Sequence, residues 1–328
     1  MGKKSDSNRF VIIDNMYTFG MLLVLLGHIG LTPAFNDTYL HRWIYSFHMP
    51  LFFWIAGFLF NKWPKGVKFV VRKAKRLLIP LFVLTTVAFL PKVFLSSFAL
   101  RRIDGGWMSY LESLFIPSDN PVQPLWFLMV LFCVYVVGVL CSNILNKDNY
   151  WGGWLVIGIL SAFASYIYSG IEFLGISRVL YYFPYFCLGV VSRKLKVIEY
   201  YGLFSIIYSV ILFCLLCVLA YYSLNKYLSA LVGLAFSISF IGWLGKIGIP
   251  FFPHLRNYTF CIYLLQWFPL VFVRIVFFNL LNLNIWICYF LMFISGLFIP
   301  ILIAKLIIKS FHSKNSFYRI LAYICGLS

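Results

Sequence analysis

Residues 285–304 read IWICYFLMFISGLFIPILIA, a run of twenty residues without a charged side chain. At about 1.5 Å per residue, a helix of this length crosses the roughly 30 Å hydrocarbon core of a bilayer. A segment in lipid must pair its own backbone polar groups, and a run this long favours a helix over the shorter alternating strands of a β-barrel. The stretch therefore predicts a transmembrane helix.

The same pattern recurs along the 328-residue chain, in which 62% of the residues are hydrophobic and 11% are charged. A soluble domain usually carries about 25% charged residues. No linker or internal repeat divides the chain, so we expect a single domain over residues 1–328. Its fold class is an all-α integral membrane protein, a bundle of about ten transmembrane helices. The predicted spans are 10–31, 43–61, 77–98, 124–145, 151–170, 178–192, 203–223, 227–245, 257–279 and 285–308.

Positive charge predicts the orientation of these spans. With the N-terminus in the cytoplasm, the cytoplasmic segments collect twenty Lys and Arg residues and the opposite loops only five. Cytoplasmic loops of membrane proteins carry this excess. We therefore expect both termini in the cytoplasm and a multi-pass protein in the cell (inner or plasma) membrane. The net charge of +18 then needs no nucleic-acid partner, because no soluble domain is predicted to carry a basic patch.

The eight cysteines lie mostly within the apolar spans and predict no disulfide framework. Cys214 and Cys217 form a CxxC pair, but no second pair and no histidine follows at zinc-finger spacing. We interpret them as small buried hydrophobes and expect no metal. The chain also lacks a Gly-rich phosphate loop, an HExxH motif and a GxSxG motif, which argues against an ATP-driven pump.

Ionisable residues inside predicted spans are candidates for function, because charge is costly in lipid. The first span holds Asp14, Tyr17 and His28 on one helical stripe, and His28 lies about 21 Å beyond Asp14 towards the outer end. Asp14 cannot orient His28 over that distance, and we expect it to pair with cytoplasmic bases. His48 lies in the second span at the same outer level. An imidazole there either draws a proton from a hydroxyl or anchors its helix at the head groups.

Residues 72–76 read RKAKR and precede the third span on the predicted cytoplasmic side. Arg and Lys side chains one helical turn apart can hold a pyrophosphate and a ribose phosphate together. Arg72, Lys73 and Arg76 are therefore candidates for a phosphate clamp. The alternative is a run that serves only to orient the protein in the membrane.

Trp126 opens the fourth span, where its ring either stacks on a sugar or joins the aromatic belt at the interface. The loop before it, about residues 99–123, is the longest outer loop, and we expect it to form a lid or rim. Lys92 and Arg274 lie inside predicted spans, and snorkelling or pairing between helices explains both without catalysis.

Taken together, these segments resemble the membrane acyltransferase-3 family of O-acyltransferases, close to its fucose 4-O-acetylase-like branch. The main stretches are residues 14–28, which end in Gly-His, residues 47–57 (FHMPLFFWIAG), the basic run before Pro80, and residues 124–128 (PLWFL). Weaker similarity occurs at 182–189 and 257–264. The match spans most of the chain.

The sequence departs from the family pattern at three positions. The family usually has Arg or Lys where Tyr17 stands and Ser where Ala56 stands, and many members have His at Gln266. The Tyr17 change leaves open a different donor, a compensating base such as Arg9 or Arg72, or a member without activity.

The resemblance implies transfer of an acyl group, in the first instance acetyl, from cytoplasmic acyl-CoA to a sugar hydroxyl of a cell-surface polysaccharide or glycolipid. Acetyl-CoA would be the donor substrate, and membrane lipids and the glycan acceptor the partners. His28 would take the hydroxyl proton or carry the acyl group transiently. The implied site residues are His28 and His48 (catalytic), Arg72, Lys73 and Arg76 (donor phosphates), Trp126 (acceptor), and Asp14 and Tyr17 (supporting).

A polysaccharide exporter or flippase, or a polymerase component, is the alternative function. A transporter would predict broken helices at the bilayer midplane and inverted repeats. A polymerase would predict a large charged outer loop, and Arg101 and Arg102 keep that hypothesis open. A purely structural membrane subunit is a further alternative, but it would not explain why His28 and His48 lie inside predicted spans.

Overall fold

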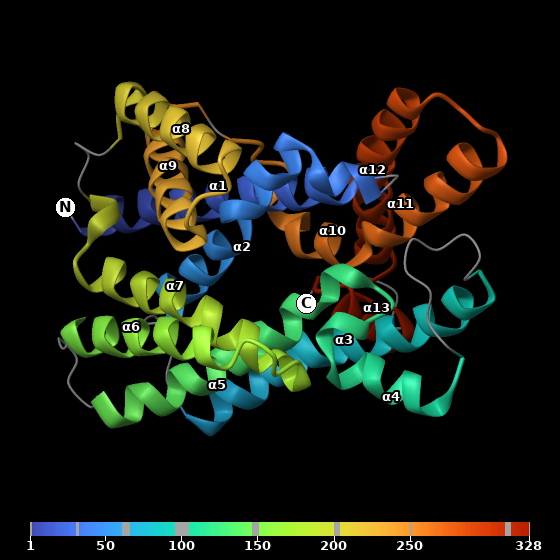
Figure 1. The fold of residues 1–328 in the computed structure, drawn as a ribbon, viewed down its shortest axis with the longest axis horizontal. Coiled ribbons are helices and arrows are strands. Elements are labelled where there is room, and N and C mark those ends of the chain that lie inside the picture. The colour runs from blue at the N-terminus through green and yellow to red at the C-terminus, as the bar shows by residue number, and fades with distance from the viewer. Residues whose placement is uncertain are drawn as a thin grey trace. The chain divides into compact units, whose positions relative to one another are not determined.

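The computed structural model describes residues 2–30, 33–60, 66–95, 105–145, 151–199, 204–249, 251–311 and 316–327. The described part is 86% helical and contains no strand. Lys62, Arg101, Arg102 and the side chain of Arg9 lie outside it. The all-α fold predicted from the apolar runs is therefore confirmed (Figure 1).

Seven helices within the described residues are long and apolar enough to cross a membrane. Two shorter apolar helices, α6 (Trp151–Ile167) and α8 (Ile206–Tyr221), cover two more of the predicted spans. The count of ten spans and the cytoplasmic termini stay predictions. The seven are Val11–His28 of α1 (Gly2–His28), α2 (Tyr39–Phe60), α3 (Val67–Phe94), Gln123–Leu145 with α5 (Trp126–Leu145), Phe173–Lys194 with α7 (Ile176–Lys194), α9 (Lys226–Lys246) and Ile285–Lys309 of α12 (Ile285–Phe311).

The predicted span 257–279 is broken rather than continuous. Its two parts, Arg256–Leu265 and Trp267–Leu280, meet at an angle of 54°. They comprise α10 (Thr259–Leu265), α11 (Trp267–Val273) and the π-helix η9 (Arg274–Leu280). Pro269 explains the break, because it has no N–H to offer the carbonyl of Leu265 and its ring clashes there.

Further short elements connect these helices. Helix α4 (Trp107–Phe115) lies in the predicted outer loop, and α13 (Ser316–Ile324) follows α12. The short 3₁₀ helices are η1 (Pro33–Asp37), η3 (Pro117–Asp119), η4 (Gln123–Leu125), η5 (Phe173–Gly175), η6 (Val197–Glu199) and η8 (Arg256–Tyr258).

The chain divides into two compact units, each made of two stretches of sequence. Unit 1 comprises Met1–Asn61 and Tyr185–Thr259, and unit 2 comprises Lys62–Pro184 and Phe260–Ser328. The single domain expected over residues 1–328 stays a prediction.

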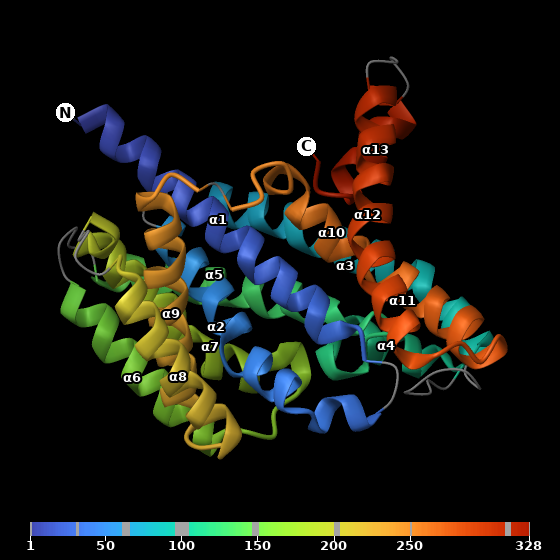
Figure 2. The same cartoon turned by 90° about the horizontal axis from the view of Figure 1, so that it is seen from above.

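In unit 1, α1, α2, α8 and α9 pack together, and Figures 1 and 2 both show α8 along α9. Helix α2 also crosses the second half of α7 with its backbone in contact. A Cβ atom added to Gly57 would lie 1.9 Å from the carbonyl oxygen of Phe186, and one added to Gly189 would lie 2.0 Å from that of Trp54. Small residues permit this close approach between helices in lipid. Gly57 of the family-like motif is therefore a packing residue.

In unit 2, the segment after α4 is fixed to α3 through Asn120, which is 2% exposed. Its Nδ2 donates to Thr85 Oγ1 (2.8 Å) and to the Ser113 carbonyl (3.2 Å), and its Oδ1 accepts from the Val122 N–H (2.9 Å). The part of the predicted outer loop from residue 105 onward is thus folded against α3. Residues 99–104 lie outside the described residues, and the lid role stays a prediction.

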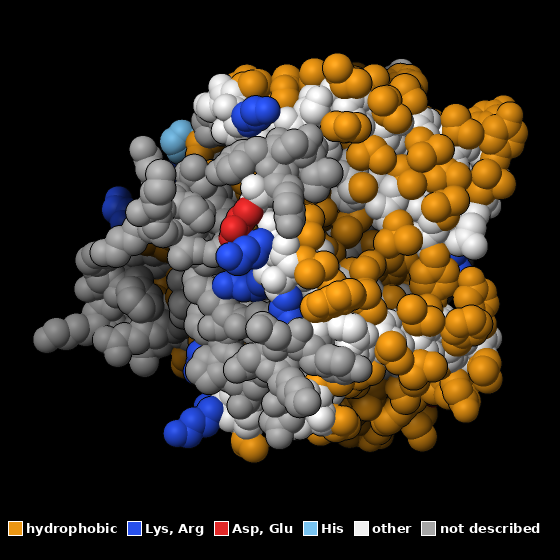
Figure 3. Space-filling view, turned by 90° about the vertical axis from the view of Figure 1, so that its left-hand side faces the viewer, with side chains coloured by type: hydrophobic (Ala, Val, Ile, Leu, Met, Phe, Trp, Pro, Cys, Tyr) orange, Lys and Arg blue, Asp and Glu red, His pale blue; other side chains and the backbone are white. Residues whose placement is uncertain are grey.

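The surface has the character expected of helices in lipid. Helix α8, for example, exposes Ile207, Val210, Ile211 and Leu215. On the face drawn in Figure 3, hydrophobic side chains cover a continuous area, and Lys, Arg, Asp and Glu gather outside it. Apolar side chains need no protein cover where lipid surrounds them, so this distribution agrees with a membrane protein.

Candidate active site

Three imidazole rings surround the ring of Tyr45 in unit 1. The centroid of the Tyr45 ring lies 4.7 Å from that of His48, 6.2 Å from that of His28, and 3.8 Å from that of His41, which stacks on it. His41, Tyr45 and His48 are four and three residues apart on α2, which places them on one helix face. His28 ends α1, which packs against α2. The structure therefore brings the two predicted histidines together through a tyrosine.

The backbone orients both predicted imidazoles in the same way. His28 Nδ1 lies 2.6 Å from the carbonyl oxygen of Val24, and His48 Nδ1 lies 2.8 Å from that of Ile44. A carbonyl oxygen only accepts, so each Nδ1 carries a proton and donates it. In a neutral ring the lone pair then resides on Nε2, which is the form that acts as a base.

The two histidines differ in accessibility. His48 is 1% exposed, whereas His28 is only partly buried. A proton acceptor must reach the group it deprotonates, so His28 is the better placed of the two. Sequence reasoning missed Tyr45 and His41. Their spacing to His48 on a single helix face is the signal that could have revealed them.

Asp14 pairs with a base from the predicted cytoplasmic side, as its distance from His28 led us to expect. Its Oδ2 lies 2.7 Å from Nη2 of Arg256 in η8. The ring of Tyr17 lies 5.8 Å from that of Phe52 on α2. Both residues thus connect α1 to its neighbours within unit 1, and neither contact reaches His28.

The basic run lies on α3 in unit 2. This helix has 28 residues, about 42 Å, which is longer than a 30 Å hydrocarbon core requires. Lys73 Nζ lies 4.1 Å from the centroid of the Tyr135 ring, and the Arg76 guanidinium lies 5.5 Å from that of Phe260. Arg72 is exposed. Cation–π contacts therefore order two of the three cations without neutralising them.

Trp126 belongs to a small aromatic and charged cluster in unit 2. Its ring stacks on that of Tyr182 with a centroid distance of 5.6 Å, and the Arg178 guanidinium lies 5.0 Å from its centroid. Arg178 also lies 3.8 Å from the carboxylate of Glu172. The Trp126 side chain is partly exposed, so it combines an ordered ring with an accessible surface.

The candidate residues are thus divided between the two units. Asp14, Tyr17, His28 and His48 belong to unit 1, and Arg72, Lys73, Arg76 and Trp126 belong to unit 2. Among the described residues, no group of three His, Cys, Asp or Glu side chains is arranged to hold a metal ion.

Comparison with known proteins identifies the family. A family model described as an acyltransferase domain, that of the acyltransferase-3 family, matches residues 10–305 and runs through both units. No curated protein and no solved structure matches the chain significantly. Since the family model covers most of the chain, this protein belongs to the acyltransferase-3 family and is a membrane acyltransferase.

Proposed function

We propose that this acyltransferase moves an acetyl group from cytoplasmic acetyl-CoA to a sugar hydroxyl of a cell-surface polysaccharide or glycolipid. The observation that carries the proposal is the pair of imidazoles at Tyr45, each fixed through Nδ1 to a backbone carbonyl. This arrangement supplies a base for an alcohol without a metal or an activated side-chain nucleophile.

In the proposed step, the oxygen of the sugar hydroxyl attacks the thioester carbonyl carbon while Nε2 of His28 takes the hydroxyl proton. A new C–O bond forms, the C–S bond breaks, and the thiolate of CoA leaves and takes the proton back from the imidazolium. The Val24 carbonyl stabilises that imidazolium, because a charged N–H donates a stronger hydrogen bond than a neutral one. The transfer is direct and needs no acyl-histidine.

His48 has a different part in this proposal. His48 is 1% exposed, so its ring is not accessible to a substrate, and it contacts the ring of Tyr45 edge-on. It can therefore influence the reaction only indirectly, through the position of Tyr45. We assign it the positioning of Tyr45, and through Tyr45 the positioning of His28. Such a residue lowers turnover when it is replaced, because a displacement of about 1 Å at the reacting groups can cost roughly a hundredfold.

The donor would bind through its phosphates to Arg72, Lys73 and Arg76. Arg72 and Arg76 are one helical turn apart, a spacing that suits two phosphate groups. The rings beneath Lys73 and Arg76 hold these cations in place and so reduce the entropy lost on binding. Trp126 would contact the sugar acceptor. Its neighbours Tyr182 and Arg178 already order its ring.

The test is transfer of labelled acetyl from acetyl-CoA to envelope glycan in membranes that contain the protein. We expect His28→Gln to lower the rate by about a hundredfold or more. His254→Gln is the matched control, since His254 is an exposed histidine of the same unit. Equal labelling by His28→Gln and wild type would overturn the assigned role. Loss of glycan export without any acetyl transfer would favour the flippase instead.

The donor site has a separate readout. Arg72→Gln and Arg76→Gln should raise the KM for acetyl-CoA several-fold and leave kcat nearly unchanged, because they remove binding that is equal in the ground and transition states. Lys246→Gln, an exposed basic residue of unit 1, serves as the control for loss of charge. An unchanged KM in both arginine variants would show that the run only orients the protein.

A further inference from the structure

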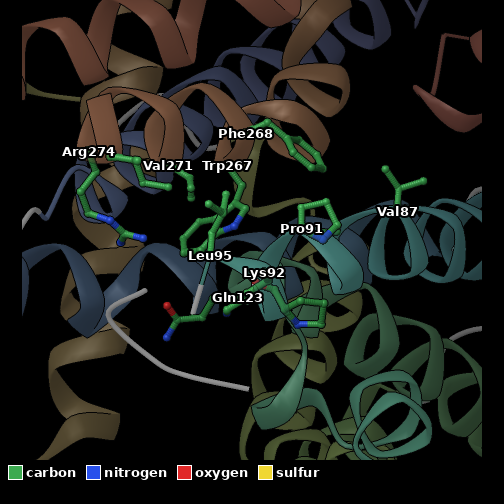
Figure 4. Close-up of a pocket in the computed structure, with 12 residues that line it drawn as sticks. Val87, Pro91, Lys92, Leu95, Gln123, Trp267, Phe268, Val271 and Arg274 are labelled. Carbon is green, nitrogen blue, oxygen red and sulfur yellow. The ribbon is translucent and has the colours of Figure 1, made fainter. Parts of the chain in front are cut away.

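Unit 2 contains a cavity of about 300 Å³ that the proposed reaction does not use. The second half of α3, the segment around Pro121 and Gln123, and the helices α11 and η9 form its walls (Figure 4). It combines apolar side chains with the two cations that the sequence places inside predicted spans, Lys92 and Arg274. Lys92 and Arg274 are almost two hundred positions apart in the sequence, and their presence around one cavity suggests a binding site for a ligand.

Arg274 is the most unusual residue of the cavity. It is 7% exposed, and its Nε has no hydrogen-bond partner among the described residues. Removing a guanidinium from water costs several kcal/mol unless an anion and hydrogen-bond acceptors compensate. None of the twelve residues that line the cavity is acidic. Among the described residues, the lining therefore offers Arg274 no carboxylate, and an anionic ligand would supply the compensating charge.

The backbone at Arg274 is also unusual. Arg274 is the first residue of the π-helix η9, and π-helical turns are rare and frequent at functional sites. The turn follows the break at Gln266. In Figure 4 the Arg274 side chain extends from this helix towards the part of the cavity that holds the Gln123 amide. The widened turn thus directs a buried cation into the cavity.

Lys92 adds a second positive charge from the opposite wall. Its Nζ donates a hydrogen bond to the carbonyl oxygen of Pro121 (2.9 Å), which fixes the ammonium beside the cavity. Two cations and the amide of Gln123 form a set of donors that matches the oxygens of a phosphate group.

The rest of the wall is apolar and continues to the outer surface of α3. Trp267 and Val271 line one side, and Val87, which is 59% exposed, lines the other. On the same helix Leu90 and Phe94 are 62% and 82% exposed. A helix face of this kind is covered by lipid in a membrane protein. An alkyl chain could therefore extend from the cavity into the bilayer without leaving an apolar environment.

We propose that this cavity binds an anionic lipid, with its phosphate head group at Arg274 and Lys92 and the first part of its chain against Trp267. A volume near 300 Å³ is at the low end for ligand pockets, which suits a head group and part of a chain rather than a whole lipid. The proposal is independent of the reaction assigned to His28. Free phosphate has the same head-group chemistry, so the experiment must separate the two sources.

The experiment uses the purified protein in nanodiscs and quenching of tryptophan fluorescence by lipids with brominated chains. The contribution of Trp267 is the difference between the wild-type protein and Trp267→Phe. We expect brominated phosphatidic acid to quench Trp267 more strongly than brominated phosphatidylcholine. Arg274→Gln should weaken the head-group preference by about tenfold or more, as expected for loss of a charged hydrogen bond. Lys309→Gln, an exposed cation of the same unit, should keep it.

Two results would overturn the proposal. The first is equal quenching of Trp267 by the two head groups in the wild-type protein, a comparison that needs no Arg274 variant to fold. The second is relief of the phosphatidic acid effect by inorganic phosphate alone, which would show that the site takes a phosphate without its chain. Arg274→Lys, which keeps the charge, should retain part of the preference and separates loss of charge from loss of fold.

Discussion

Replacing Gly57 with alanine tests the helix crossing on which the geometry of unit 1 depends. The added Cβ would lie 1.9 Å from the carbonyl oxygen of Phe186, whereas ordinary contacts of a Cβ begin near 3.4 Å. The obstacle is backbone, which cannot rotate away as a side chain can. Helices α2 and α7 would therefore have to separate locally by about 1.5 Å.

The magnitude follows from the cost of overpacking. Inserting a methyl group into a well-packed interface costs about 1–3 kcal/mol. At about 2–4 °C per kcal/mol, the Tm of the protein in detergent should fall by roughly 2–12 °C. Transferase activity should also fall, because α2 carries Tyr45 and His48 and its displacement moves both relative to His28.

The assay is thermal unfolding of the purified protein, with Gly152→Ala as the matched control. Gly152 lies in α6, and a Cβ atom there would meet nothing within 4 Å among the described residues. Alanine is the better helix former, so this control should have an unchanged or slightly higher Tm. If Gly57→Ala unfolds at the same temperature as Gly152→Ala, the two backbones are not in contact and the account of the crossing is wrong.

The remaining predictions concern polar contacts outside the reaction. Asn120→Ala should lower the free energy of unfolding by about 1–3 kcal/mol, because it leaves buried groups without partners. Asn225→Ala should lower the free energy of unfolding by only about 1 kcal/mol, because it removes the N-cap of α9. Chemical or thermal unfolding of the two variants measures the difference, and a larger cost at Asn225 would contradict it. A double-mutant cycle on Asp14 and Arg256 should give a coupling below about 1 kcal/mol that weakens with salt, since the two side chains are 26% and 52% exposed. A salt-independent coupling of several kcal/mol would show that the pair is shielded from water.

Much of the candidate site was accessible from the sequence because membrane helices constrain where polar residues can stand. Asp14, His28 and His48 were visible as ionisable groups in apolar runs, and their depth followed from the rise of a helix. Tyr45 was not visible in this way. A tyrosine near a helix end is ordinary in a membrane protein. Its spacing from His41 and His48 on α2 was an available signal, but only the packing of α1 on α2 shows that His28 also contacts its ring.

The broken helix at Gln266 and the cavity beyond it were missed for a different reason. Pro269 was the available signal, but hydropathy averages over a window and does not register a missing N–H. The transporter hypothesis predicts broken helices, so the break between Leu265 and Trp267, taken alone, would have favoured a transporter. The family match decides for an acyltransferase, and the break instead presents Arg274 to a cavity.

The sequence by itself determined that this protein is an all-α membrane protein of the acyltransferase-3 family, because apolar length, charge placement and local motifs are properties of contiguous residues. Only the tertiary structure decided which of those residues meet. Gly57 and Gly189 are 132 positions apart in the chain, and the contact of their helices depends on backbone geometry that no local pattern encodes. From the sequence, snorkelling or pairing between helices explained Lys92 and Arg274, and only the fold places both around one cavity. In lipid, where apolar surface gives little specificity between helices, such close contacts and shared polar sites determine how the spans pack.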